Sequence, residues 1–139
     1  MSLLAIENLH MAIHGFPVLK GVTLRVAAGE VLGVIGESGS GKSMTAFSVM
    51  QLLPEGATCS GQILLDGKDV LAMEERALCA MRGCDVGMVF QEPMAALNPL
   101  KTIGAQVAET VALHTGASAA EAWAQARMAL ARAELPEER

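Results

Sequence analysis

The stretch VLGVIGESGSGKS, residues 31–43, decides how the rest of this chain is interpreted. Its apolar start, rich in Val and Ile, predicts a short buried strand. A glycine-rich turn follows, and the segment MTAFSVM at residues 44–50 is typical of a helix. Every fixed position of the pattern G-x-x-x-x-G-K-[ST] is matched, by Gly36, Gly41, Lys42 and Ser43. This strand, loop and helix therefore predict a loop that holds nucleotide phosphates.

The residue types in this loop suit a ligand with several negative charges. Glycines allow the backbone to curl until its N–H groups point inward, and the helix that follows adds unpaired N–H groups and a dipole. We expect Lys42 to neutralise the β- and γ-phosphates and the Ser43 hydroxyl to bind Mg²⁺, which prefers oxygen ligands. The alternative is a Gly/Ser turn that happens to precede Lys-Ser. It leaves the apolar strand before the turn unexplained.

Composition and charge narrow the class of protein. A chain of 139 residues suits one domain, and 52% hydrophobic residues with only 3% aromatic residues predict an aliphatic core. The net charge of −5 gives no basic footprint for nucleic acid, so we expect no nucleic-acid partner. Apolar runs stay well below the roughly 18 residues that span a bilayer. We therefore expect a cytoplasmic protein.

Cysteine and histidine form no metal or disulfide pattern that we can identify. The cysteines are odd in number and lack a C-x-x-C pair, so we expect small reduced thiols at Cys59, Cys79 and Cys84. The histidines are scattered, and surface or boundary positions are expected for His10, His14 and His114.

Alternation and turn residues predict a strand-rich beginning. Residues 3–9 and 22–27 alternate and are separated by Gly15-Phe16-Pro17, which favours an antiparallel pair. Residues 60–66 predict another strand that ends in an Asp66-Gly67 turn, and residues 73–81 predict a helix.

A second buried strand is predicted at residues 85–90, DVGMVF. It places Gln91 at its carboxyl end, the edge at which open α/β sheets bind ligands. A polar residue that simply ends the strand is the alternative for Gln91.

Beyond Pro93 the chain becomes alanine-rich and helical in pattern. Apolar residues recur every four positions from Ile103, which predicts a helix ending near Gly116. A capping box, Ser118 to Glu121, then begins a second helix, which Pro136 ends. Its apolar stripe consists of Trp123, Ala126 and Leu130, and we interpret Trp123 as a packing residue rather than a ligand contact.

Two separated motifs together resemble one family. GESGSGKS at 36–43 and VFQEPMAALNP at 89–99 resemble the ATPase subunit of ATP-binding cassette (ABC) transporters, more narrowly its dipeptide, oligopeptide and nickel importer branch. LKGV at 19–22 and SGQI at 60–63 extend the resemblance over essentially the whole chain. It implies an α/β P-loop NTPase fold. A RecA-like core with an antiparallel β-subdomain would occupy residues 1–95, and an α-helical subdomain would begin in residues 96–139.

The resemblance also implies roles for individual residues. ATP with Mg²⁺ would be bound by the loop residues Gly36, Glu37, Ser38, Gly39, Ser40, Gly41, Lys42 and Ser43. Ser43 and Gln91 would be the metal ligands, and Lys42 and Gln91 the catalytic residues. Residues 92–99 and the helices after them would contact a membrane permease at the cytoplasmic face of the membrane. A second ATPase subunit would complete the assembly, which couples ATP hydrolysis to solute uptake.

This sequence departs from the family pattern in two ways. Family members stack adenine on an aromatic residue before the loop, and this chain contains no Tyr. Of Ile13, His14 and Phe16 in that region, only Phe16 is a candidate. The serine-glycine-glycine signature, the Walker B strand ending in Asp-Glu and the switch histidine have no counterparts; ILLD at 63–66 is followed by Gly67. We therefore expect an N-terminal portion that binds Mg-ATP weakly, hydrolyses it poorly and leaves strand edges unpaired.

Two other functions fit the loop. One is a nucleotide-binding module that does not turn over. The other is a small P-loop phosphotransferase, which usually gathers arginines in a mobile lid. Here the arginines are spread along helices predicted to lie at the surface, at Arg76, Arg82, Arg127, Arg132 and Arg139.

Overall fold

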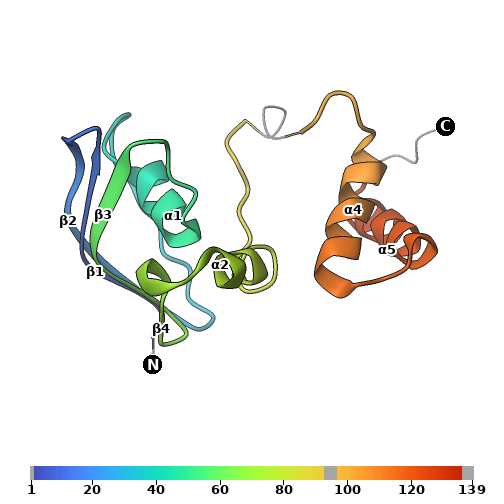
Figure 1. Ribbon diagram of the computed structural model, residues 1–139, viewed down its shortest axis with the longest axis horizontal. Helices are drawn as coiled ribbons and strands as arrows, with labels where there is room; N and C mark the ends of the chain where they lie inside the picture. Colours follow the sequence, from blue (N-terminus) through green and yellow to red (C-terminus); the bar gives the residue numbers. More distant parts are fainter. Residues whose placement is uncertain (1, 93–96, 136–139) are drawn as a thin grey trace. The chain divides into compact units, whose positions relative to one another are not determined.

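The computed structural model describes residues 2–92 and 97–135, in two compact units, Met1–Arg82 and Gly83–Arg139. Figure 1 shows the elements of both units, and each unit is described by itself. Three predictions fall partly or wholly outside the described residues. They concern residues 93–96 of the second motif, Pro136 as a helix end, and the charged terminus after it.

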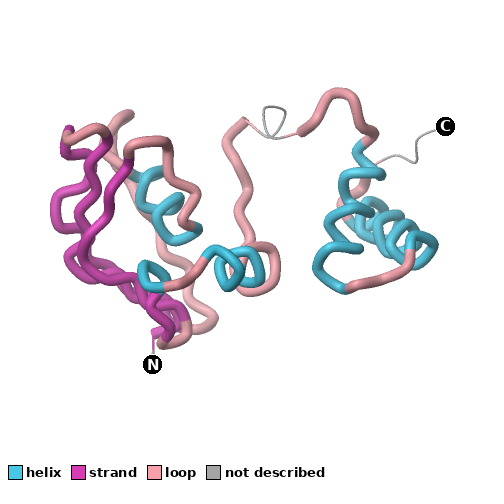
Figure 2. The backbone as a smooth tube through the Cα atoms, in the orientation of Figure 1, coloured by secondary structure: helices cyan, strands magenta, loops and turns pink. Residues whose placement is uncertain are grey.

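The first unit is built on an antiparallel sheet of four strands (Figure 2). Its order is β2-β1-β3-β4, and the strands are β1 (Ser2–Ile13), β2 (Phe16–Ala27), β3 (Ala57–Leu65) and β4 (Lys68–Asp69). The antiparallel pair and the strand at 60–66 are thus confirmed. Phe16 and Pro17 belong to β2 because the hairpin turns earlier, at His14 and Gly15, which both have positive φ.

Helices lie on one side of this sheet and complete an aliphatic core (Figure 1). They are α1 (Lys42–Met50), the 3₁₀ turn η1 (Val70–Ala72) and α2 (Glu75–Met81). Buried strand residues meet buried helix residues in this core, which contains Ile6, Leu9, Met11, Leu19, Val49, Met50, Ile63, Val70, Leu78 and Met81. The composition predicted such a core, because so few aromatic side chains are available to fill it.

The two predicted parallel strands are absent from the structure, so the predictions for residues 31–35 and 85–90 are wrong. Residues 31–37 have no strand or helix conformation, and only an isolated bridge at Val86 occurs in the second segment. The side chains of Val31, Ile35 and Val89 are 95%, 99% and 95% exposed. A buried parallel strand needs neighbouring strands and covered faces. Among the described residues no strand pairs with either segment.

Arg82 joins α2 to the end of α1. Its Nε donates to the Met50 carbonyl at 2.8 Å, its Nη2 to the Gln51 carbonyl at 3.1 Å, and its Nη1 to the Glu75 carboxylate at 2.7 Å. The Arg82 side chain is 20% exposed. The prediction of a surface arginine is therefore wrong at this position, because the last carbonyls of α1 need a donor.

The second unit is a helical hairpin, α4 (Ile103–Thr115) and α5 (Ala119–Arg132). Gly116 ends α4 and the Ser118–Glu121 capping box begins α5, both as predicted. Small residues let the helices approach closely around Ala108, Ala122 and Ala126. The Trp123 ring covers Gly104, where an added Cβ would come within 2.9 Å of Cζ3, so Trp123 is a packing residue. Among the described residues, no helix is long and apolar enough to cross a bilayer.

Candidate phosphate-binding site

Tight backbone turns give the loop at residues 36–43 its shape. Gly39 and Gly41 have φ of +81° and +90°, a region that side chains with a Cβ rarely enter. Gly36 lies against Ser40 instead, where an added Cβ would come within 2.7 Å of the hydroxyl oxygen. The Ser40 N–H donates to the Glu37 carbonyl at 3.2 Å and closes the turn. Where Gly36 and Ser40 lie closest, the loop therefore has no room for a side chain on Gly36.

The Lys42 ammonium lies inside this loop. Its Nζ donates to the carbonyls of Gly36 at 2.6 Å and Glu37 at 2.7 Å, and to the Ser40 hydroxyl at 3.2 Å. These partners come from the opposite side of the loop, so they fix the end of a side chain that would otherwise be flexible. A positive charge is thus held at the centre of the curled backbone, which favours an anion there.

No side chain caps the N-terminus of α1. Its N-cap is Gly41, which makes no side-chain capping bond, and no acidic residue lies in the first turn. By contrast, the side chains of Thr102 and Ser118 cap α4 and α5. The free N–H groups and the positive end of the dipole are the features that bind phosphate at helix N-termini.

The remaining loop residues present polar groups at the surface. Ser38 and Ser43 are exposed, and Ser43 stands in the first turn of α1 beside Lys42. Thr45 secures the turn because its N–H and its hydroxyl both donate to the Gly41 carbonyl, at 2.9 and 3.0 Å. The Ser43 hydroxyl is therefore held on an ordered turn, where an oxygen ligand for Mg²⁺ fits.

Strand β2 borders the end of the loop, a contact that sequence reasoning missed. A Cβ on Gly41 would come within 2.5 Å of the Leu19 side chain and 3.6 Å of the Val18 carbonyl. Phe16 begins the same strand two residues earlier and is 76% exposed. The LKGV segment, which we used only for the family resemblance, was the available signal for this contact.

Gln91 belongs to the second unit, and the structure describes it only within that unit. It is exposed and follows residues 87–90, which form neither helix nor strand. The four residues 93–96 of its motif lie outside the described chain. The structure therefore brings Gly36, Glu37, Ser40 and Lys42 together and leaves the pairing of Gln91 with Ser43 untested.

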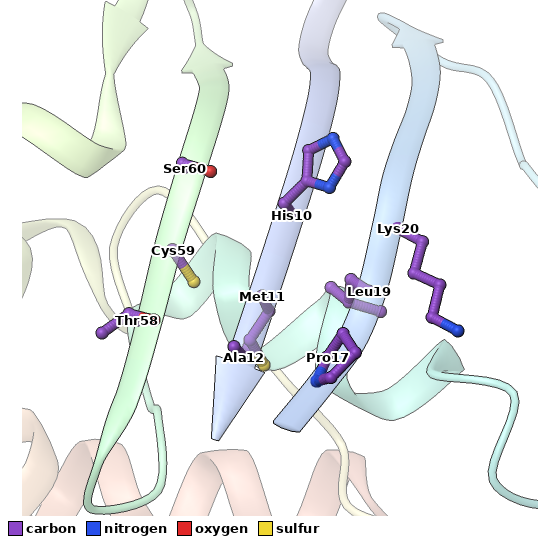
Figure 3. Close-up of a pocket in the computed structure, with 9 residues that line it drawn as sticks. All are labelled: His10, Met11, Ala12, Pro17, Leu19, Lys20, Thr58, Cys59 and Ser60. Atoms are coloured by element: carbon purple, nitrogen blue, oxygen red, sulfur yellow. The ribbon is translucent and has the colours of Figure 1, made fainter. Parts of the chain in front are cut away.

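A shallow depression of about 240 Å³ lies on the sheet (Figure 3). It is lined by residues from β1, β2 and β3, including His10, Lys20, Cys59 and Ser60. None of residues 36–43 lines it. A depression alone does not indicate a binding site. The loop is the better candidate because it offers the converging donors that an anion requires.

Comparison with known families supports this interpretation of the loop. The family model described as "ABC transporter" matches residues 19–139. The chain belongs to the ABC transporter family. The match includes the whole phosphate-binding loop and the segment around Gln91. The resemblance inferred from the two motifs is thereby confirmed, and the phosphotransferase alternative loses its support.

Similar proteins are ATP-binding proteins of transport systems. The chain is 44% identical over 140 residues to the probable D,D-dipeptide transport ATP-binding protein DdpD of Escherichia coli, covering 96% of this chain and 43% of DdpD. It is 48% identical over 126 residues to the peptidoglycan transport ATP-binding protein YejF of Agrobacterium fabrum, covering 86% of this chain and 23% of YejF.

A third relative is the glutathione import ATP-binding protein GsiA of Salmonella paratyphi A, 40% identical over 147 residues, with 98% of this chain and 24% of GsiA covered. The chain thus spans less than half the length of these relatives. The names of these relatives refer to D,D-dipeptide, peptidoglycan and glutathione, and nickel importers are not among the proteins named here.

Proposed function

We propose that this chain is the nucleotide-binding part of an ABC importer ATPase that takes up peptides or related solutes. The observation that carries the proposal is the Lys42 ammonium at the centre of a glycine loop that opens on the uncapped N-terminus of α1. Two sources of positive potential converge there: an ammonium and the N–H groups at the positive end of the helix dipole. A triphosphate is the common biological anion with matching charge.

ATP and Mg²⁺ fit the residues of this site. Backbone N–H groups at residues 38–43 and the Lys42 ammonium would bind the β- and γ-phosphates, and the Ser43 hydroxyl would bind Mg²⁺. Phe16 is the proposed adenine contact, which is supported by its exposure and by the contact of its strand with Gly41. Mg-ATP supplies a phosphoanhydride bond whose hydrolysis drives transport, and these residues hold and orient it.

The finer architecture is also a proposal. We infer that residues 1–95 belong to a RecA-like nucleotide-binding core with its β-subdomain, and that 96–139 begin a helical subdomain. Gln91 would act with Ser43 on the metal and would couple nucleotide state to the segment after it. A second ATPase subunit and a permease are the proposed partners, at the cytoplasmic face of the membrane.

Exposed apolar side chains provide positions at which the permease contact can be tested. Leu100, Ile103 and Leu113 of the second unit are 92%, 41% and 79% exposed. Contiguous apolar patches mark partner surfaces, whereas single exposed apolar residues are ordinary. Leu100→Glu should reduce co-purification with the permease and leave ATP binding intact. Loss of both, or of neither, would contradict the assignment of this face.

Nucleotide binding is tested by titrating the 139-residue chain with Mg-ATP in a calorimeter. We expect weak binding that requires Mg²⁺. Lys42→Ala should weaken it by about tenfold or more, since it removes a charge-assisted bond worth roughly 1.5–3 kcal/mol. Lys68→Ala is the matched control because Lys68 is an exposed lysine of the same unit, on β4. Equal affinities of both variants and the unchanged chain would refute the proposed site.

A further inference from the structure

The three thiols of this chain have different surroundings. All are free; Cys59 is partly buried, and Cys79 and Cys84 are exposed. Burial raises the pKa of the Cys59 thiol, opposed by a hydrogen bond with Ser48. Cys79 faces a carboxylate, with its Sγ 3.5 Å from Glu75 Oε1. Cys84 faces an imidazole instead, with its Sγ 3.4 Å from His114 Nδ1.

The partner decides how readily each thiol gives up its proton. A carboxylate next to a thiol accepts the hydrogen bond but opposes a second negative charge. An imidazole can take the proton itself and then pair with the thiolate, which is the nucleophilic form of cysteine. Cys84 and Cys79 are both exposed to solvent, so a difference in their reactivity would come from the neighbouring group and not from accessibility.

Two further features position the imidazole beside Cys84. His114 stands in the last turn of α4, at the negative end of the helix dipole. The ring is also held on its other side. A Cβ on Gly83 would come within 2.9 Å of His114 Nε2, so the ring packs against the backbone that carries Cys84.

We propose that Cys84 and His114 form a thiol modification site that reacts with small peroxides. The Cys84 thiolate attacks one peroxide oxygen, the O–O bond breaks, and hydroxide leaves with the proton of the His114 imidazolium as water. Sulfur is oxidised by two electrons to the sulfenic acid, and hydrogen peroxide is reduced to water. The described residues contain no group of three or more metal-ligating side chains, so a metal role has no support at this pair.

Trypsin cleavage places the three cysteines in different peptides, so the modification rate of each can be measured in one sample. Cys59, Cys79 and Cys84 fall in the peptides 43–68, 77–82 and 83–101. We would treat the folded chain with limiting iodoacetamide, and separately with hydrogen peroxide plus dimedone, and measure each peptide by mass spectrometry. Cys79 is the internal control because it is equally open but faces a carboxylate.

The expected order of rates is Cys84, then Cys79, then Cys59. We expect Cys84 to exceed Cys79 by about threefold or more in both reactions, because the His114 imidazole beside its Sγ can accept the thiol proton. His114→Ala and His114→Gln should each lower the Cys84 rate toward that of Cys79 and leave the other two unchanged.

Urea supplies a test that does not require a variant to fold. Unfolding separates His114 from Cys84, so the three rates in the unchanged chain should become similar. Equal rates for Cys84 and Cys79 in the folded chain would overturn the proposal. So would a Cys84 rate that His114→Ala or urea does not change relative to Cys79.

Discussion

Replacing Arg82 should destabilise the first unit more than replacing any other arginine that the structure describes. In the folded chain its guanidinium donates to two backbone carbonyls, of Met50 and Gln51, and to the Glu75 carboxylate. Arg82→Ala removes all three donors. The two carbonyls then end α1 without this partner, and only limited water can replace it because the Arg82 side chain is 20% exposed.

The expected loss is about 2–3 kcal/mol. A hydrogen bond from a charged donor contributes roughly 1.5–3 kcal/mol, and two of them end on partly buried carbonyls. We discount their sum because water can reach this edge of the unit. The pair with Glu75 adds little to the total, since the Glu75 side chain is 71% exposed and solvent screens it.

Urea unfolding monitored by circular dichroism measures this loss. With a slope near 1 kcal/mol/M, the midpoint should fall by about 2–3 M. Arg76→Ala is the matched control, because Arg76 is an exposed arginine of α2, the helix that Arg82 follows. Arg82→Lys should give an intermediate loss, since one ammonium cannot reproduce the planar fork. A change within about 0.5 kcal/mol for Arg82→Ala would refute the capping role.

Three further changes test other contacts. The Arg82 hydrogen bond is the largest cause that lowers the pKa of Glu75 from 4.5, so its stabilising effect is present above that value and is lost as pH falls through the lower folded-state pKa. Glu75→Gln should therefore lessen the drop in urea midpoint between about pH 6 and about pH 3; an unchanged drop would count against the pair. Ser118→Ala should destabilise α5 by about 1 kcal/mol, seen as a lower urea midpoint in the fluorescence of Trp123, the one tryptophan. Gly104→Ala should push the same indole outward and shift its emission to longer wavelength, and an unshifted spectrum would disprove the contact.

Features set by neighbouring residues were predicted well from the sequence. The Asp66-Gly67 turn, the Gly116 helix end and the Ser118–Glu121 capping box each involve residues a few positions apart. The tight turn of the glycine loop at residues 36–43 is of this kind too. Its shape comes from glycine geometry and from the start of a helix, so sequence spacing was sufficient to indicate it.

Features that depend on distant neighbours were not predictable in the same way. The apolar runs at 31–35 and 85–90 satisfy the pattern of buried parallel strands, but a strand forms only beside another strand. Nothing in those runs specifies the partner. Arg82 was missed for the same reason, because its acceptors lie 31 and 32 positions away in the chain. A charged residue on a helix face gives no local sign of the carbonyls it will cap.

The two ends of α1 are treated oppositely by this fold, and that difference separates stability from binding. Arg82 satisfies the C-terminal carbonyls, whereas the N-terminal N–H groups beside Lys42 have no side-chain cap. The ends lie about 12 Å apart at 1.5 Å per residue, beyond the range at which substitutions usually couple.

Mg-ATP should therefore raise the urea midpoint of the unchanged chain and of Arg82→Ala by the same increment, because a ligand that binds only the folded state stabilises it by its own affinity. Lys42→Ala should differ from Arg82→Ala: without nucleotide its midpoint should fall less, because the carbonyls that accept from Lys42 lie in an exposed loop, and Mg-ATP should add little increment. If Arg82→Ala also abolished the increment, the Arg82 contacts at one end of α1 and the proposed phosphate site at the other end would be energetically coupled. The separation argued from its two ends would then fail.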